Sequence, residues 1–275
     1  MSQTVPFPAL PEWLPIAAED RPVALRAFGS DMRDLSVEFA GVARPRLVTS
    51  LLARCAQTRD GGPPPERAIW DLPLGMRIEA VMALATGDSA LPLVWRVRCC
   101  HTGCGAESEL ELRPAEIAAL SAEAHREKLV PVRIGARTAW LRRPTGADQR
   151  QWLDSGAEET APLAASLFVD PALDDLRAAG IALDEIGDSI DRAMEEYDPL
   201  VGFHLEVGCP ECGRPTAQAP DLLAGALERL WLAQFDLIEQ VHRLASHYHW
   251  TEEEIAEVPF WRRQAYLARI DGGEL

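Results

Sequence analysis

The residues of this sequence with the clearest potential for chemistry are its six cysteines. They fall as one isolated residue, one group of three and one pair: Cys55, then Cys99, Cys100 and Cys104, then Cys209 and Cys212. A disulfide framework spreads its cysteines more evenly and belongs to secreted chains, whereas clustered thiols in a chain where we expect no signal peptide favour metal binding. The two clusters are therefore candidate sets of metal ligands.

The pair has the form of a zinc knuckle. In the Cys-Pro-Glu-Cys-Gly sequence of residues 209–213, two residues separate the thiols, so both can bind one ion, and the glycine allows a tight turn that brings backbone amides towards the sulfurs. Residues 100–105 also end in Cys-Gly, with three residues between the thiols, and structural zinc sites use about two to four. The sequence therefore predicts a four-thiolate Zn²⁺ site made of Cys100, Cys104, Cys209 and Cys212.

These assignments have alternatives. Cys99 or His101 could replace Cys100 as a ligand, and we prefer Cys100 because Cys99 continues the register of the preceding strand. The thiols of residues 209–212 could be a redox dithiol or carry no metal, but a redox pair normally begins a helix, and Gly-Arg-Pro follows here. Cys55 lies on a predicted helix and is expected in the core. Because a closed four-sulfur site leaves no position for water, we expect the metal to serve folding and not catalysis.

Each knuckle lies where a β-hairpin should turn. Apolar and polar residues alternate along 94–98 and again along 108–112, on either side of the first knuckle. The same alternation along 201–207 precedes the second knuckle, and a short segment at 216–219 follows it. Two hairpins could then face each other across one tetrahedral ion. The 104 residues between the knuckles are far more than a turn needs, which predicts an inserted subdomain.

The predicted fold class is α+β: mainly helical, with β-hairpins forming a split zinc ribbon, an inserted α/β subdomain and a C-terminal helical module. The predicted domains are an extended N-terminal arm at 1–20, a helical segment with the first zinc-knuckle hairpin at 21–113, the insert at 114–200, the second zinc-knuckle hairpin at 201–220 and the C-terminal module at 221–275. Periodicity predicts helices within 31–58, at 74–86 and, in the insert, near 114–126, 146–154, 158–168 and 182–196. It also predicts a hairpin in the insert, formed by 129–134 and 137–141.

The C-terminal module is predicted to consist of three helices. A long helix at 221–247 carries an apolar stripe that we expect to be buried against the body or a partner: Leu223, Leu227, Leu230, Phe235, Ile238, Val241 and Ala245. A capping box at Thr251 and Glu254 begins a short acidic helix, and a final helix covers 260–270. Trp250 and Trp261 flank the acidic helix, where aromatic rings suit a partner surface as well as a core.

Composition narrows the choice of partner and compartment. The chain has 27 basic and 43 acidic residues and a formal charge of -16, which repels the phosphates of nucleic acid. No apolar run approaches the roughly 18–20 residues of a membrane-spanning helix. We therefore expect a cytoplasmic protein that binds neither nucleic acid nor a membrane.

A search for catalytic motifs predicts a protein that is not an enzyme. The sequence has no nucleophile elbow, no His-Glu-x-x-His helix and no phosphate loop with lysine, Lys128 being its single lysine. A cluster of His242, His247 and His249, with Glu239 or Glu252, could hold a metal or move protons, but histidines near a helix C-terminus are also favoured by the helix dipole. The acidic residues of one helix are expected to form a solvated face: Asp184, Glu185, Asp188 and Asp191.

Several segments resemble assembly proteins of contractile tails. Residues 244–255 and 258–267 are similar to the C-terminal signature of small assembly proteins of contractile phage tails and phage-tail-like injection systems. Residues 74–105, a helical segment leading to a strand pair with a knuckle, resemble the baseplate protein family of T4-like phages, and the Arg-Pro-Thr-Gly segment within 141–148 is similar to that family's segment before a helix.

The resemblance implies a baseplate or hub assembly role, as a structural part or a chaperone, without enzymatic activity. The implied partners are baseplate, hub or tape-measure proteins of a contractile tail. We therefore hypothesise a zinc-stabilised assembly protein whose C-terminal module, through Trp250, Trp261 and Tyr266, docks on such a partner. The alternative is a zinc-ribbon regulatory adaptor that binds another protein.

Overall fold

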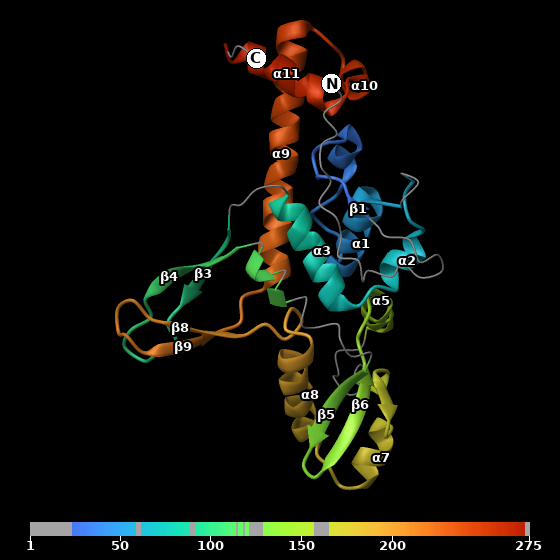
Figure 1. Ribbon diagram of the computed structural model, residues 1–275, viewed down its shortest axis with the longest axis vertical. Helices are drawn as coiled ribbons and strands as arrows, with labels where there is room; N and C mark the ends of the chain where they lie inside the picture. Colours follow the sequence, from blue (N-terminus) through green and yellow to red (C-terminus); the bar gives the residue numbers. More distant parts are fainter. Residues whose placement is uncertain are drawn as a thin grey trace.

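The computed structural model describes residues 24–58, 62–87, 92–113, 115–117, 119–120, 129–156 and 165–272. The predicted arm at 1–20 lies outside these residues. The chain is mixed α+β, with helices and four small antiparallel sheets in the described part. The long helix α9 (Leu222–Tyr248) runs along the upper half of the molecule, with two hairpins projecting from its lower end and a further sheet and helices at the opposite pole (Figure 1).

A helical body packs against the first part of α9. Its helices are α1 (Arg44–Cys55), α2 (Glu66–Trp70) and α3 (Leu74–Thr86), and the short strands β1 (Ala24–Leu25) and β2 (Ala56–Gln57) pair beside them. Along α1, apolar residues at three- to four-residue spacing are buried in a core that also includes Leu227 and Leu230 of α9. Cys55 belongs to this core, as predicted, and burial raises the pKa of its thiol to about 12.

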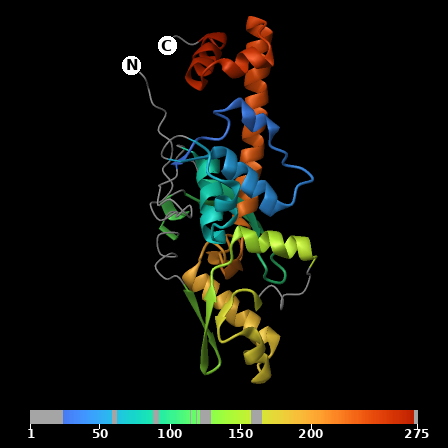
Figure 2. The same cartoon turned by 90° about the vertical axis from the view of Figure 1, so that its right-hand side faces the viewer.

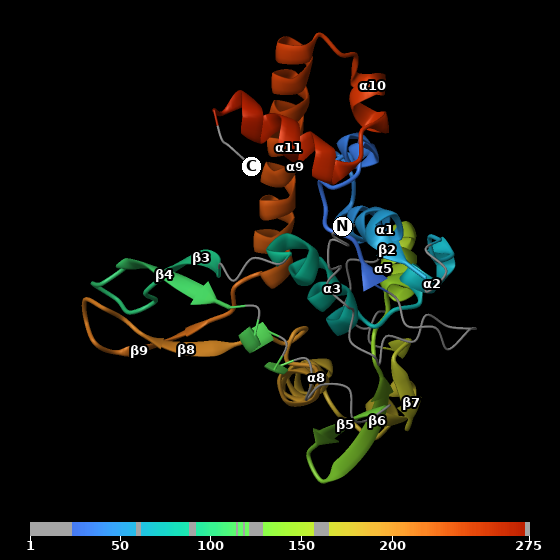
Figure 3. The same cartoon turned by 45° about the horizontal axis from the view of Figure 1, so that its top comes forward.

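The two predicted knuckle hairpins are present and lie side by side (Figures 1 and 3). The first consists of β3 (Leu93–Arg98) and β4 (Glu107–Leu112), and the second of β8 (Leu205–Gly208) and β9 (Pro215–Gln218). The strand predicted to start at 201 begins only at Leu205, because residues 198–202 form turns whose amides hydrogen-bond the carbonyl of Asp198. Each hairpin is a sheet of its own, so hydrogen bonds of a common ladder do not join them.

The insert forms a separate hydrophobic cluster at the lower pole (Figure 2). The predicted hairpin is present as β5 (Leu129–Ile134) and β6 (Arg137–Arg142), and an unpredicted third strand, β7 (Phe168–Asp170), gives the order β5-β6-β7. The helices α7 (Leu173–Ala178) and α8 (Leu183–Tyr197) contribute to the same cluster. The predicted end of the helix near 158–168 is therefore wrong, because residue 168 begins a strand. Residues 157–164 of that prediction lie outside the described part.

Two pieces of the predicted insert pack on the helical body instead. The helix α5 (Gly146–Ser155) contacts α1 and α2, and Ile117 joins the core of the helical body. Of the helix predicted near 114–126, residues 115–117 and 119–120 are helical, and the others lie outside the described residues. Where the chain leaves and returns to the body, Arg143 and Asp198 form an ion pair of 2.8 Å with both side chains buried.

The C-terminal module has the three predicted helices. After α9 come α10 (Glu252–Glu257) and α11 (Phe260–Ile270). The predicted capping box is present: Thr251 Oγ1 accepts from the amide of Glu254 at 3.2 Å, and a Glu254 carboxylate oxygen accepts from the amide of Thr251 at 2.8 Å. Ile255 and Leu267 of α10 and α11 pack against Leu244 of α9 in a third core.

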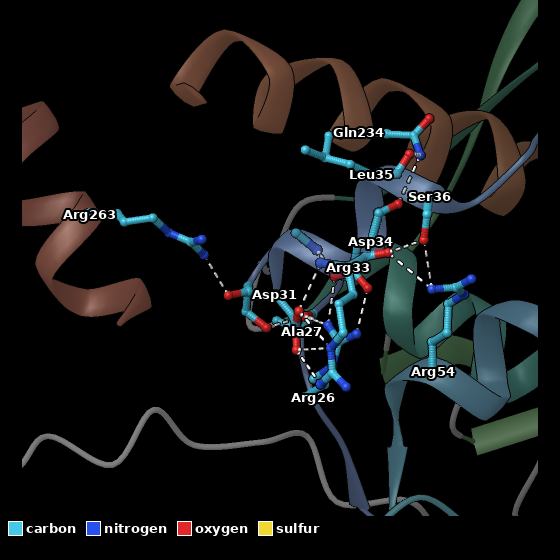
Figure 4. A network of polar contacts seen from close by, with 12 residues as sticks. Arg26, Ala27, Asp31, Arg33, Asp34, Leu35, Ser36, Arg54, Gln234 and Arg263 are labelled. Carbon is cyan, nitrogen blue, oxygen red and sulfur yellow. Dashed lines mark hydrogen bonds and ion pairs between the residues drawn. The ribbon is translucent and has the colours of Figure 1, made fainter. Parts of the chain in front are cut away.

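The 3₁₀ helix η1 (Met32–Ser36) joins this module to the helical body through polar contacts (Figure 4). Arg26 and Asp34 form a buried bidentate ion pair, and Gln234 of α9 donates to the carbonyl oxygens of Asp34 and Val37, each at 2.9 Å. Arg263 of α11 reaches the carbonyl of residue 30 at 2.7 Å. No helix in the described part of the chain is long and apolar enough to cross a membrane.

Candidate metal centre

Four cysteine sulfurs converge between the two hairpins. They belong to Cys99, Cys104, Cys209 and Cys212, and all four lie within 4.8 Å of one another. The Sγ atoms of Cys99 and Cys212 are 3.8 Å apart, and those of Cys104 and Cys209 are 3.6 Å apart. Four sulfurs bound to one tetrahedral zinc at about 2.3 Å would be separated by roughly 3.8 Å. The thiols are therefore spaced closely enough to bind one metal ion together.

The predicted ligand Cys100 is wrong, because the structure places Cys99 in the group instead. Along β3 the side chains alternate between buried and exposed, with Trp95 and Val97 on the buried face. The amide of Cys99 donates to the carbonyl of Ala106 at 2.9 Å, which extends the ladder by one residue. Cys99 therefore follows Val97 on the buried face, and Cys100 points to solvent. From the sequence we prefer Cys100 as a ligand because Cys99 continues the strand register. In the structure this same register directs the sulfur of Cys99 towards the second hairpin.

The other alternative, His101, has a different role. Its Nε2 lies 2.8 Å from the carbonyl oxygen of Pro215, so the ring donates a hydrogen bond from the first hairpin to the second. Gln218 does the reverse, since its side-chain amide donates to the carbonyl of Arg98 at 3.0 Å. These contacts hold the hairpins together on the two sides of the cysteine group.

Backbone amides approach three of the sulfurs from two residues downstream. The amide of Arg214 donates to the sulfur of Cys212 and contributes most to lowering its pKa to about 6. For Cys99, the hydroxyl of Thr216, 3.5 Å from the sulfur, and the amide of His101 lower the pKa. Donors to sulfur favour the thiolate, which is the form that binds metal.

Cys104 has the opposite balance. The amide of Ala106 lowers its pKa, but burial and the neighbouring sulfurs together raise it to about 11. Four thiolates cannot all carry charge at this distance without a cation between them, because like charges disfavour each other's ionisation. The backbone amides thus favour thiolates, whereas the closeness of the four sulfurs disfavours them. A bound cation would remove this conflict.

Glycines allow the turns that bring these amides inward. Gly105 and Gly213 follow the second cysteine of each knuckle and adopt φ angles of 65° and 69°. Only glycine takes this conformation without steric cost from a Cβ. The role that the sequence predicts for the two Cys-Gly pairs is confirmed.

The first hairpin is attached to α9 through Trp95. Its indole Nε1 donates to the carbonyl oxygen of Asp221 at 3.0 Å. The ring also lies directly against Gly225, where an added Cβ would be 2.5 Å from Nε1 and 2.8 Å from Cε2. The position of the cysteine group is therefore linked to the start of the long helix.

The three predicted partner-binding residues are placed differently from one another. Trp250 stacks on Tyr248 with ring centroids 4.8 Å apart, and Tyr266 contacts Trp250 at 5.1 Å, so both pack within the C-terminal module. Trp261 is 62% exposed. Of the three, Trp261 offers the largest free surface.

The structure also leaves an apolar surface exposed on α9. Four large side chains on the middle of α9 are about half exposed: Trp231, Leu232, Phe235 and Ile238. Phe235 and Ile238 belong to the predicted stripe, and the body leaves them uncovered, whereas Leu227 and Leu230 of the same stripe are buried. The clustering of Trp231 with Phe235, at i and i+4, could have indicated a second apolar face.

The histidines near the end of α9 do not form a second metal group. His242, His247 and His249 are exposed, and His247 packs on the ring of Tyr248. Among the described residues, the four cysteines are the one group of three or more potential ligands whose atoms converge.

Comparison of the chain with models of protein families, with curated proteins and with solved structures finds no match.

Proposed function

We propose that the four cysteines bind a structural Zn²⁺ ion and that the two hairpins form a split zinc ribbon. The observation that carries this proposal is the convergence of the four sulfurs from two hairpins that share no ladder. Clustered thiolates in near-tetrahedral spacing are the ligands that structural zinc prefers. Since four sulfurs fill the coordination sphere, the ion has no position for a substrate, and its free energy of binding stabilises the fold.

We further propose that the protein acts by binding, as a structural or chaperone component in baseplate or hub assembly of a contractile injection system. Segments at 74–105, 141–148 and 244–267 support this role by their resemblance to such assembly proteins. The exposed face of α9 supports a binding role independently, because an apolar patch of this kind on a helix marks a protein-interaction site. The partner is a baseplate, hub or tape-measure protein.

The metal proposal is tested with two adjacent serine variants. Cys99→Ser should reduce bound zinc well below one ion per chain and lower the melting temperature, because a buried ligand is lost. Cys100→Ser is the matched control and should keep one zinc and the melting temperature of the wild type, because Cys100 is exposed. Elemental analysis and thiol titration with and without chelator measure the bound zinc of the two variants, and thermal denaturation measures their melting temperatures. Equal zinc content in the two variants would contradict the assignment.

The binding proposal is tested by copurification with the proteins of a contractile tail expressed together. Phe235→Glu places a charge in the exposed face of α9 and should abolish partner capture while zinc content and melting temperature stay unchanged. Glu228→Gln, an exposed substitution on the same helix, should leave capture intact. Capture of regulatory proteins in place of tail proteins would instead support a zinc-ribbon adaptor.

A further inference from the structure

A hollow of about 540 Å³ lies at the helical body and is lined by other elements than those that carry the four-cysteine group. Its walls come from one face of α1, from α2 and from α5. Three arginines line it, Arg46, Arg54 and Arg150, together with Trp70 and one acid, Glu66. Three guanidinium groups thus gather at one surface of a chain whose formal charge is -16.

Two of these arginines have no carboxylate partner among the described residues. Arg54 donates to neutral oxygens, the carbonyl of Arg33 at 3.1 Å and the hydroxyl of Ser36 at 2.9 Å (Figure 4). Arg150 lies over the ring of Trp70, with its Cζ 4.9 Å from the centroid. Neither guanidinium group therefore forms an ion pair within the described part of the chain.

The other two charged groups of the hollow are Arg46 and Glu66. Arg46 pairs with Asp154 at 2.8 Å, on the exposed surface. Glu66 accepts a hydrogen bond of 3.0 Å from the indole Nε1 of Trp70, which fixes the carboxylate beside the tryptophan. With Asp154 counted, three arginines face two acids.

A buried cation adds to the positive charge. The side chain of Arg77 is 2% exposed, lies 5.2 Å from the centre of the Trp70 ring and donates to neutral acceptors alone among the described residues. Two of these acceptors are the carbonyl of Ile69 and the hydroxyl of Thr49. A buried charge without a counterion acts over a longer distance than an exposed one, because water screens it less. Trp70 is thus contacted by one buried and one exposed guanidinium.

In a neighbouring hollow, most of the arginines are paired with carboxylates. It has a volume of about 210 Å³ and shares Arg54 with the first. Its two other arginines are each paired with an aspartate: Arg26 with Asp34 at 2.5 Å, and Arg33 with Asp31 at 2.6 Å. Among the described residues, the two unpaired arginines of these hollows are therefore Arg54, which lines both hollows, and Arg150, which lines the first.

We propose that the hollow over Trp70 binds a small phosphate-class oxyanion. The planar donors of Arg54 and Arg150 suit phosphate oxygens, which guanidinium groups bind through paired hydrogen bonds. The volume falls in the range of roughly 300–1,000 Å³ that small-ligand sites occupy. We expect charge to select the ligand, because guanidinium groups occupy the space around the Trp70 ring and leave less of it for an apolar ligand.

Isothermal titration of the full chain with inorganic phosphate and with pyrophosphate tests the proposal. The wild type should bind pyrophosphate at one saturable site, and Arg150→Gln and Arg54→Gln should each weaken binding about tenfold or more, as expected for loss of a charged donor. Arg137→Gln is the control, because Arg137 is exposed at the turn of the β5-β6 hairpin and should leave binding unchanged. Melting temperature and zinc content check that each variant is folded.

Three results would overturn the proposal. The first is the absence of saturable binding at millimolar pyrophosphate. The second is binding by both Arg150→Gln and Arg54→Gln with wild-type affinity. The third is binding of citrate without binding of either phosphate, which would assign the hollow to carboxylates. None of these results depends on the cysteine group or on a protein partner.

Discussion

Replacing Gly225 by alanine tests whether the cysteine hairpin is fixed to α9 by close packing. An added Cβ would lie 2.5 Å, 2.8 Å and 3.0 Å from three atoms of the Trp95 indole. The indole is 9% exposed and donates to the carbonyl of Asp221, so the ring cannot move aside without losing a hydrogen bond. Gly187, in the interior of α8, is the matched control, because a Cβ there would meet nothing within 4 Å.

The expected magnitudes follow from two opposing effects. Alanine in place of glycine within a helix stabilises by about 1 kcal/mol, and this gain applies at both positions. Overpacking against a rigid ring costs about 1–3 kcal/mol, and this cost applies at Gly225 alone. Gly187→Ala should therefore raise the free energy of unfolding by up to about 1 kcal/mol. Gly225→Ala should be about 1–3 kcal/mol less stable than Gly187→Ala.

Urea denaturation followed by circular dichroism measures both variants against the wild type. Intrinsic fluorescence at the same urea concentrations reports on the tryptophans, including Trp95. If Gly225→Ala were as stable as Gly187→Ala, the close contact between the hairpin and α9 would not exist in solution. A loss of stability with unchanged zinc content would locate the effect in the packing and not in the metal.

Three further outcomes are expected. Arg77→Met should lower the free energy of unfolding by about 1–3 kcal/mol in urea denaturation, because three neutral acceptors lose a charged donor while the volume stays filled; an unchanged midpoint would mean that these hydrogen bonds contribute nothing net. Removing metal with a chelator at pH 7 should lower the melting temperature but keep most of the helical circular dichroism, since three cores are built from apolar residues outside the cysteine group; a melting temperature that does not change would refute a structural metal. The side chain of Arg33 holds the pKa of Asp31 at about 2, below its usual value, so the stability from this pair is present above about pH 4 and is lost as the pH falls towards 2. Between about pH 4 and 2, the free energy of unfolding of Asp31→Asn should therefore fall by about 0.5 kcal/mol less than that of the wild type, a small difference because Arg33 is largely exposed. Identical pH dependence of the free energy of unfolding in the variant and the wild type would contradict the pairing.

Local patterns predicted the elements around the cysteines correctly. Alternation along 94–98 and 108–112 identified the first hairpin, and the Cys-Gly pairs identified its turn and that of the second. The choice between Cys99 and Cys100 failed because it depended on which face of β3 meets the other hairpin. That face is set by contacts with residues more than 100 positions away in the chain, which periodicity does not reveal.

The same limit applies to the apolar stripe of α9, which was expected to be buried against the body or a partner. Its apolar residues are too many for one face, and the sequence does not say which of them the body covers. Leu230 packs in the core of the helical body and Phe235 remains half exposed, although both were assigned to one stripe. The strand β7 was missed because its three residues pair only with β6 and have no alternation of their own to detect. The arginines of the hollow were likewise invisible, since Arg46, Arg54 and Arg150 come from two helices that meet only in the folded chain.

The long separation between the knuckles has a consequence for synthesis of the chain. Cys99 and Cys104 leave the ribosome more than 100 residues before Cys212. At about 5–20 residues per second, these two thiols wait on the order of 5–20 s for the second hairpin. During that time the thiols of Cys99 and Cys104 lack the company of Cys209 and Cys212, and free thiols are open to oxidation. Exposure to oxidants should therefore damage newly made chains far more than completed ones.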